Sequence, residues 1–272
     1  MQTILRTSYV FGPVRSRRLG ASLGINVLPI KKKICSLNCI YCECGWNTDE
    51  INENVPQDLL SFPVSKIIKT ELESVFVKIK NSSDVIDVIT FSGNGEPTLH
   101  PQFAEIIDDT IELRNKYVPS VKIAVLSNST NLGKEKIINA LKKIDKPILK
   151  LDSANIDTFE KINLFGINNK KNDGKNKITI EKIIEGMRKF EGNFIFQTMF
   201  LKGILNNEII DNTTDIEING LIEAMKTTNP KQIMIYSLDR TPPANNLIKL
   251  NSNEMKRIAN IIENAGFNVM YV

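Results

Sequence analysis

Histidine is nearly absent from this sequence, which has only His100 among its 272 residues. Hydrolytic mechanisms that use a histidine base, and zinc sites with several histidine ligands, therefore have almost nothing to draw on. We expect His100 to support the turn before Pro101. The chemistry of this chain must come from other types of residue.

Long apolar runs are also lacking. No stretch reaches the roughly 18 consecutive apolar residues that a membrane-spanning helix needs. Residues 1–18 do not have the charged-then-apolar order of a signal peptide. Hydrophobic residues make up 42% of the chain, too many for a disordered protein. We therefore expect a folded cytoplasmic protein without a membrane partner.

Neither sign of charge dominates, since 35 Lys and Arg stand against 31 Asp and Glu. This small excess permits a polyanionic partner without requiring one. No Pro- or Ser-rich linker divides the chain and no internal repeat is visible. We expect one domain over residues 1–272, with an N-terminal extension at 1–20, a core at about 21–243 and a C-terminal helix and strand at 252–272.

Apolar runs rich in Val and Ile alternate with segments of helical period, the pattern of repeated βα units around a parallel sheet. The predicted strands are Leu23–Val27, Val85–Ser92, Val121–Ser127, Ile148–Leu151, Phe194–Phe200 and Gln232–Ser237. The predicted helices are Ser65–Ile79, Pro101–Lys116, Lys134–Lys142, Ile180–Lys189, Glu217–Thr227 and Ser252–Ala265. Six units form a partial barrel or a doubly wound sheet, and either places the chemistry at the carboxyl ends of the strands.

The segment from Ile162 to Ile180 is dense in Asn, Lys and Gly. Such a composition is too polar to pack and too rich in turn formers to be regular. We predict an exposed loop there.

All four cysteines lie between residues 35 and 44, spaced C-x3-C-x2-C-x-C. A disulfide framework would spread its partners along the chain, so the clustering points to a metal. Three thiolates, from Cys35, Cys39 and Cys42, can hold an iron-sulfur cubane and leave one iron open. The alternatives are a structural zinc site of all four cysteines and a closed cluster with Cys44 as fourth ligand.

The C-x3-C-x2-C spacing, with the aromatic Tyr41 before the last cysteine, resembles the signature of the radical S-adenosylmethionine (SAM) superfamily. The resemblance implies an α/β fold, a partial (β/α)6 TIM-like barrel of the radical SAM type. It implies a 4Fe-4S cluster on the three cysteines whose open iron binds SAM. An electron from the cluster, supplied by a reductant such as flavodoxin or ferredoxin, then splits SAM into methionine and a 5'-deoxyadenosyl radical that abstracts hydrogen from the substrate.

A second motif, GNGEP, follows the predicted strand Val85–Ser92. Glycines there let a ligand approach the backbone closely. The motif resembles the Gly-Gly-Glu-Pro segment of the superfamily, which implies contact with the SAM amino group. The residues carried over as cofactor-binding are Tyr41, Gly93, Asn94, Gly95 and Glu96.

Further polar residues stand where predicted strands end. By the same resemblance, Asp152 is the candidate for the SAM ribose, and Ser127 and Asn128 for the methionine part or the substrate. Gln197 and Tyr236 complete the cofactor-binding candidates. The simpler interpretation of Ser, Asn and Asp at these places is capping of helices and turns.

The segment GPVRSRRLGASLGI, with GNGEPTLHP and LDRTPP, resembles a branch of the superfamily related to the tRNA wybutosine-base (4-demethylwyosine) synthases and similar small iron-sulfur oxidoreductases. Planar guanidinium groups can bind a carboxylate or phosphate, although clustered arginines often form salt-bridged surfaces. The substrate-binding candidates are Arg15, Arg17, Arg18 and Arg240.

Three hypotheses about function follow. RNA modification, with tRNA as partner, is favoured by the resemblance to the wybutosine-base synthase branch. Lysines at 170, 171, 175 and 177 could contact the phosphates of the RNA. The absence of cysteines outside 35–44 argues against enzymes that hold a second cluster. An activating enzyme that places a glycyl radical on a partner protein also fits one cluster. The third hypothesis is a metal-binding module without catalysis.

Overall fold

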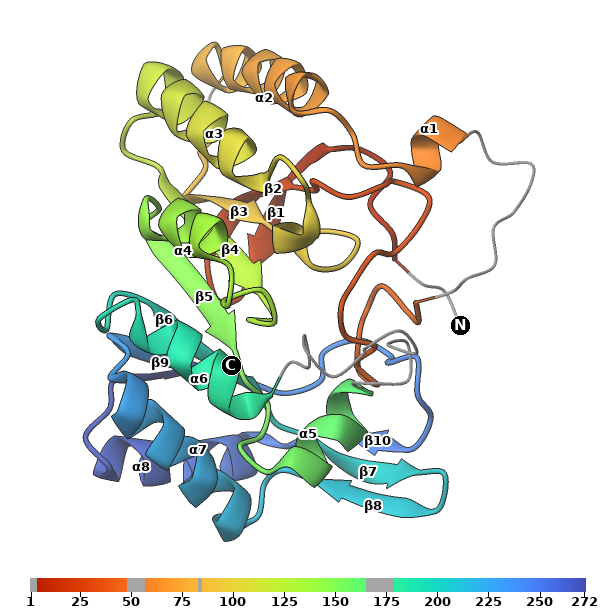
Figure 1. The fold of residues 1–272 in the computed structure, drawn as a ribbon, viewed down its shortest axis with the longest axis vertical. Helices are drawn as coiled ribbons and strands as arrows, with labels where there is room; N and C mark the ends of the chain where they lie inside the picture. Colours follow the sequence, from red (N-terminus) through yellow and green to blue (C-terminus); the bar gives the residue numbers. More distant parts are fainter. Residues whose placement is uncertain (1–3, 48–56, 83–84, 165–178) are drawn as a thin grey trace.

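The computed structural model describes residues 4–47, 57–82, 85–164 and 179–272, and is built on an eight-stranded sheet in the order β1-β2-β3-β4-β5-β6-β9-β11. Six neighbouring strands in this order are parallel. They are β2 (Gly20–Ile25), β3 (Val88–Phe91), β4 (Lys122–Ser127), β5 (Lys146–Lys150), β6 (Ile195–Met199) and β9 (Gln232–Tyr236). The sheet curls into a half-barrel, so the predicted strands and the partial barrel are confirmed (Figure 1).

Two further strands extend the sheet at its edges. At one edge β11 (Val269–Tyr271) pairs parallel with β9, which confirms the expected C-terminal strand. At the other edge β1 (Val10–Ser16) pairs antiparallel with β2. Residues 10–16, which the sequence placed in an extension, thus belong to the sheet itself.

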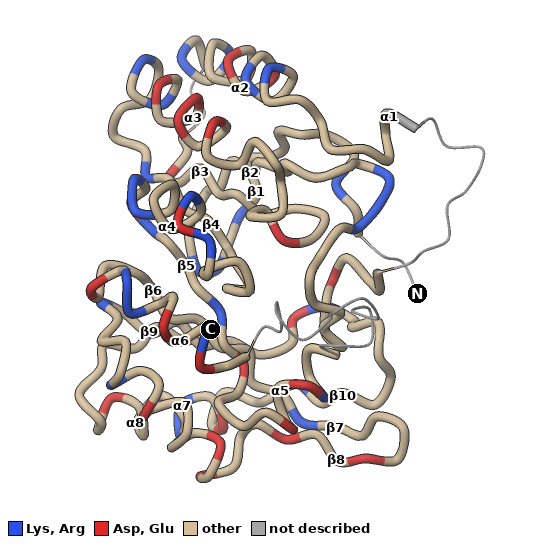
Figure 2. Tube along the Cα trace, in the orientation of Figure 1, with Lys and Arg blue, Asp and Glu red and all other residues tan. Residues whose placement is uncertain are grey.

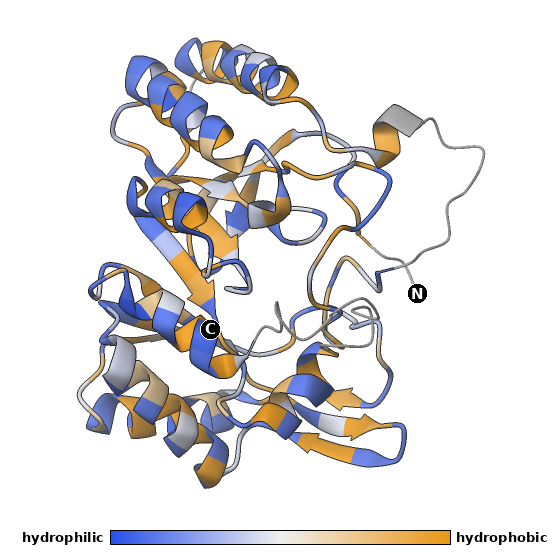
Figure 3. Cartoon of the chain, in the orientation of Figure 1, coloured by the Kyte–Doolittle hydropathy of each residue, from blue (hydrophilic) through white to orange (hydrophobic). Residues whose placement is uncertain are grey.

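The helices cover the outer face of the half-barrel (Figure 1). Each has an apolar face toward the strands and a hydrophilic face outward, which is plain on α2 and α3 in Figure 3. All six predicted helices are confirmed: α2 (Ser65–Lys80), α3 (Phe103–Tyr117), α4 (Glu135–Lys142), α6 (Ile180–Arg188), α7 (Asp215–Thr228) and α8 (Ser252–Asn264). The structure adds α1 (Gln57–Leu60), the 3-10 turn η1 (Pro97–Leu99) and α5 (Ile156–Asn163).

A small antiparallel sheet after β6 was not predicted. It consists of β7 (Lys202–Leu205), β8 (Glu208–Asp211) and β10 (Leu247–Ile248). The β7–β8 turn contains Asn206 and Asn207, both with positive φ. Asparagine tolerates this left-handed conformation, which hairpin turns of two residues require. The Asn-Asn pair was the available signal in the sequence.

The prediction of an exposed loop at 162–180 is partly wrong. Residues 165–178 lie outside the described residues. Ile162 and Asn163, by contrast, end α5 and are fully buried, and Ile180 begins α6 and is also buried. The Asn-rich composition suggested exposure, but the Asn163 side chain points into the protein and contacts other polar groups.

The inside of the half-barrel has its own apolar cluster, separate from the core between sheet and helices. It is formed by one residue from each of β3, β4, β5, β6 and β9, namely Val88, Ala124, Ile148, Ile195 and Met234. Side chains two positions further along a strand point to the same face. Polar residues that follow on these strands therefore face the concave side, above an apolar floor.

The β1–β2 turn reaches across to the opposite side of the half-barrel. Arg17 forms an ion pair with Asp239 (3.2 Å), and the Arg18 guanidinium lies over the Tyr236 ring, 4.2 Å from its centroid. Leu19 packs against the inner apolar cluster. The first hairpin therefore contacts the end of β9 and the loop after it, far along the sheet order.

His100 has the structural role that the sequence predicted. Its Nε2 lies 2.8 Å from the carbonyl oxygen of Pro63, and its Nδ1 accepts a hydrogen bond from the backbone of Gln102. Burial lowers the pKa of His100, which favours the neutral ring. The side chain thus fastens the turn before α3 to the chain ahead of α2.

No helix in the part of the chain that the structure describes is long and apolar enough to cross a membrane. The outer helices carry charges of both signs (Figure 2).

Candidate functional site

Cys35, Cys39 and Cys42 lie in a loop that follows β2, at the carboxyl end of the strand. Cys39 is buried, and Cys35 and Cys42 are partly buried. The loop turns tightly, because the amide of Cys42 donates to the carbonyl of Cys39 and the amide of Gly45 donates to that of Cys42. The cysteine loop, residues 33–45, therefore presents Cys39 and Cys42 in two successive turns, with Cys35 ahead of them.

The GNGEP motif is joined to the cysteine loop by backbone pairing. The amide of Ile34 donates to the carbonyl of Asn94 (2.9 Å), and the amide of Glu96 donates to that of Ile34 (3.0 Å). Gly95 has a φ of +133°, and a Cβ there would overlap the carbonyl oxygen of Ile34. The sequence analysis predicted that a ligand approaches the backbone at this glycine. In the structure the cysteine loop itself approaches Gly95.

Asn94 is fully buried and acts as a local anchor. Its side-chain amide donates to the carbonyl oxygens of Arg6 and Pro29, and its oxygen accepts from the amide of Arg6. The carbonyl of the neighbouring Gly93 accepts from the thiol of Cys44 (3.3 Å). A direct contact of Asn94 with a cofactor stays a prediction, since its polar atoms are all used within the protein.

Glu96 is a buried carboxylate at the centre of a second cluster of predicted residues. It accepts from the backbone and hydroxyl of Thr98, from the Ser127 hydroxyl (2.9 Å) and from the Asn128 amide (2.6 Å). Burial raises the pKa of Glu96, and these donors partly oppose that rise. The ends of β3 and β4 thus bring together Glu96, Ser127 and Asn128, which the sequence named separately.

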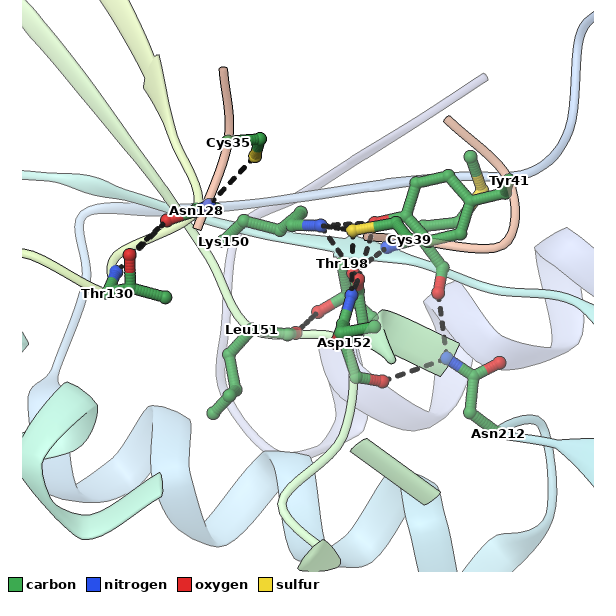
Figure 4. A network of polar contacts seen from close by, with 12 residues as sticks. Cys35, Cys39, Tyr41, Asn128, Thr130, Lys150, Leu151, Asp152, Thr198 and Asn212 are labelled. Carbon is green, nitrogen blue, oxygen red and sulfur yellow. Dashed lines mark hydrogen bonds and ion pairs between the residues drawn. The ribbon is translucent and has the colours of Figure 1, made fainter. Parts of the chain in front are cut away.

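Asn128 connects this carboxylate cluster to the cysteines. Its side-chain amide donates to the sulfur of Cys35 (3.5 Å) and to the hydroxyl of Ser36 (3.0 Å). Its oxygen accepts from Thr130, which holds the amide in this orientation. Figure 4 shows Asn128 between Thr130 and Cys35.

Asp152, Tyr41 and Lys150 form a buried network beside Cys39 (Figure 4). The Tyr41 hydroxyl donates to Asp152, and Lys150 donates to Tyr41, to Asp152 (3.0 Å) and to the sulfur of Cys39 (3.5 Å). Burial, and next the Asp152 charge, raise the pKa of Tyr41 well above its usual value. The sequence had named Tyr41 and Asp152.

Lys150 was missed by the sequence analysis. A lysine in the apolar run of β5, two positions before Asp152, was the signal, because residues at this spacing share one face of a strand. Its pKa is raised, since the attraction of Asp152 and Cys39 outweighs the opposing effect of burial. The network therefore holds an ammonium group beside Cys39.

Asn163, at the end of α5, also meets this network. Its amide donates to Cys39 (3.1 Å) and to Asp152 (3.0 Å). The other oxygen of Asp152 accepts from the backbone of Met199. The Asn163 oxygen is buried and has no hydrogen-bond partner among the described residues. Buried polar atoms usually have a hydrogen-bond partner, so this oxygen, next to a cysteine thiol, is suited to contact a bound group.

Gln197 and Tyr236 differ in their surroundings. Gln197 is buried within β6 and donates to the sulfur of Met234 (3.2 Å). Tyr236, at the end of β9, lines a cavity of about 400 Å³. The cavity brings Tyr236 together with Tyr41, Cys42, Cys44, Gly93 and all four predicted arginines, Arg15, Arg17, Arg18 and Arg240.

The thiols occupy different electrostatic environments. Burial raises the pKa of Cys35 to about 12. The hydrogen bond from Cys44 is the largest influence on Cys42, whose pKa is lowered to about 5 with further help from Lys33. Burial lowers the pKa of Lys33, but the attraction of Cys42, Cys35 and Cys39 outweighs it and leaves a net rise. The Cys42 thiol therefore ionises more readily than the Cys35 thiol.

Three thiols in one short loop are the donor set of an iron-sulfur cluster that leaves one iron open. Among the described residues, no three Cys, His, Asp or Glu side chains converge on one position suited to a metal ion. The sulfur of Cys35 accepts from Asn128, which follows β4, and the sulfur of Cys39 accepts from Asn163, at the end of α5. The amides that point at their sulfurs are of the type that stabilises cluster thiolates.

A half-barrel of parallel strands, with a three-cysteine loop and a buried carboxylate at the strand ends, is the arrangement that the resemblance to radical SAM enzymes predicts. The family model described as the radical SAM superfamily matches residues 30–215. The chain belongs to this superfamily, whose enzymes perform SAM-dependent radical chemistry with an iron-sulfur cluster.

Curated relatives extend the similarity along the chain. A UPF0026 protein of Helicobacter pylori (strain ATCC 700392 / 26695) is 30% identical over 258 residues, which cover 93% of this chain and 73% of the relative. A protein named GTPase Obg, from Brachyspira hyodysenteriae, is 31% identical over 95% of this chain. The matched region is only 34% of that protein, so the chain spans about a third of its length.

Solved structures share the fold. A radical SAM methyltransferase from Sphaerobacter thermophilus aligns with a TM-score of 0.65 at 12% identity, over 92% of this chain and 65% of that one. Streptococcus suis SuiB bound to the precursor peptide SuiA aligns with a TM-score of 0.61 at 13% identity, over 92% and 48%. At these identities the likeness concerns the fold alone.

Proposed function

We propose that Cys35, Cys39 and Cys42 hold a 4Fe-4S cluster, and that SAM binds between this cluster and the ends of β3, β4 and β5. The observation that carries the proposal is the backbone pairing of Ile34 with Asn94 and Glu96, which fixes the cysteine loop against the buried carboxylate. When bound, the cluster would supply the electron that cleaves SAM reductively to the 5'-deoxyadenosyl radical.

The chain's own residues would hold the two ends of SAM. Glu96 offers a carboxylate for the amino group, already oriented by Ser127, Asn128 and Thr98. Asp152 is the candidate for the ribose hydroxyls, with Tyr41 and Lys150 positioning its carboxylate. A buried, pre-oriented carboxylate loses little freedom when a ligand binds, which favours affinity.

Cys44 stays outside the proposed ligand set. Its thiol donates to the carbonyl of Gly93 and lies beside Cys42. One residue separates Cys42 from Cys44, so both would reach one cluster only with difficulty. We propose that Cys44 orients Cys42.

The test is anaerobic reconstitution with iron and sulfide, followed by dithionite and SAM. We expect about four iron atoms per chain, the number in one cubane, and 5'-deoxyadenosine in the product mixture. Cys39→Ala should lose both, whereas Cys44→Ser should retain the cluster. A colourless, zinc-loaded protein that leaves SAM intact would refute the proposal and favour the non-catalytic module.

The finer hypotheses on substrate stay predictions. RNA modification drew support from lysines at 170, 171, 175 and 177, which lie outside the described residues. Glycyl-radical activation would require a large protein partner. Salt-sensitive binding of tRNA would support the first, and a stoichiometric complex with a glycyl-radical enzyme would support the second.

A further inference from the structure

The 400 Å³ cavity beside the cysteine loop is lined by more positive than negative side chains. Its acidic lining residues are Glu43 and Asp239. Its basic lining residues are Arg6, Arg15, Arg17, Arg18 and Arg240. Low-dielectric walls lined by one sign of charge concentrate ligands of the opposite sign.

Two of these arginines are already neutralised. Arg17 pairs with Asp239 (3.2 Å) and Arg240 pairs with Glu43 (2.7 Å). Both pairs are about half exposed, so they contribute little to stability and mainly fix the positions of the side chains.

Arg6, Arg15 and Arg18 have no carboxylate partner among the described residues. Arg18 lies over the ring of Tyr236 (4.2 Å) and Arg6 over the ring of Phe11 (4.3 Å). A guanidinium that stacks by its face keeps the N–H donors of its edge available. Two of the three are thus held in place with their donors still free.

The same cavity reaches the proposed reaction centre. Tyr41, Cys42 and Gly93 form part of its lining, together with Tyr236 under Arg18. A group bound by the arginines would share one cavity with the cysteine loop. Such proximity is what hydrogen abstraction from a substrate requires.

We propose that this cavity binds a small substrate that carries a carboxylate or phosphate group, with Arg6, Arg15 and Arg18 as its ligands. The substrate class rests on the proposed function. The volume suits a small molecule, and guanidinium forks bind either anion in bidentate fashion. Five arginines and two carboxylates line the cavity. We therefore expect a ligand whose negative charge balances the three arginines that have no carboxylate partner.

The test is calorimetric titration of the reconstituted protein with pyrophosphate and, separately, with citrate. Each titration is made first without SAM and then with SAM at saturation, and reductant is omitted from both. Arg18→Gln and Arg15→Gln remove one cavity charge each, and the exposed Arg15 can be changed without disturbing packing. Arg188→Gln, on the exposed side of α6, is the matched control with the same change in net charge.

We expect one of the two anions to bind with SAM present, and each cavity variant to weaken binding about tenfold or more, as loss of a charge-assisted hydrogen bond predicts. The Arg188→Gln protein should bind as the unchanged protein does. Binding of pyrophosphate would identify phosphate as the group recognised, and binding of citrate would identify carboxylate.

Three results would overturn the inference: no binding of either anion, equal weakening by Arg188→Gln, or loss of binding when SAM is added. The last would assign the arginines to the carboxylate of SAM. Iron content and 5'-deoxyadenosine formation are measured on the same preparations. If these fail while anions bind, the proposed function is wrong and the anion site stands.

Discussion

Lys150 and Asp152 form the most buried ion pair among the described residues, with side-chain exposures of 12% and 0%. Removing one partner from such a pair leaves an uncompensated buried charge, whereas removing both charges costs much less. The pair therefore lends itself to a double-mutant cycle.

We expect Lys150→Met to lower the free energy of unfolding by about 3–5 kcal/mol, the usual cost of breaking a buried pair. The combined Lys150→Met/Asp152→Asn protein should recover a large part of that loss, because Asn can still accept from Met199. Urea unfolding of the cluster-free protein measures both. If the single and double changes lower the free energy of unfolding equally, the loss does not come from the uncompensated charge of a broken ion pair.

At the scale of elements, the junction between the cysteine loop and the GNGEP motif depends on one glycine. Gly95 combines a φ of +133° with contact to the Ile34 carbonyl, so any side chain there is both strained and obstructed. Gly133, in contrast, would place an added Cβ in open space. The two positions form a natural comparison.

Gly95→Ala should separate the cysteine loop from the motif and reduce iron incorporation severalfold, because the Ile34 hydrogen bonds can no longer form. Gly133→Ala should incorporate iron normally. Iron and sulfide content after reconstitution, together with circular dichroism to confirm folding, measures the effect. Normal iron content in folded Gly95→Ala protein would show that the junction does not position the cysteines.

At the scale of the whole molecule, the cysteine loop connects distant parts of the half-barrel. The amides of Asn38 and Ile40 donate to the carbonyls of Asn163 and Ile162, at the end of α5. The carbonyl of Ile40 accepts from Ala244, in the segment after β9. A group bound to the cysteines would thus stiffen contacts between elements from both halves of the sequence.

Removal of iron by a chelator should raise hydrogen exchange at the amides of Asn38, Ile40 and Ala244, since ligation restrains the loop that they join. Amides within the parallel sheet, such as that of Val125 in β4, should change little. Mass-spectrometric exchange before and after iron removal compares them. Unchanged exchange at the loop would mean that its contacts hold without the metal.

Much of the fold and of the site followed from local sequence. Hydrophobic periodicity predicted six strands and six helices because each element buries one continuous face. The cysteine spacing and the GNGEP turn identified the superfamily because both are contiguous. The sequence analysis did not predict the β7–β8 hairpin, the burial of Asn163 or the role of Lys150. Each of these depends on contacts between residues that are far apart in the sequence.

The sequence by itself determined the class of chemistry, because three thiols within eight residues can meet one cluster whatever surrounds them. Only the tertiary structure decided which polar groups face those thiols. Asn128, Lys150 and Asn163 come from different strands and helices, and the curl of the sheet brings them to the cysteine loop. The same curl gathers the arginines of the first hairpin at the end of β9, where they line a cavity.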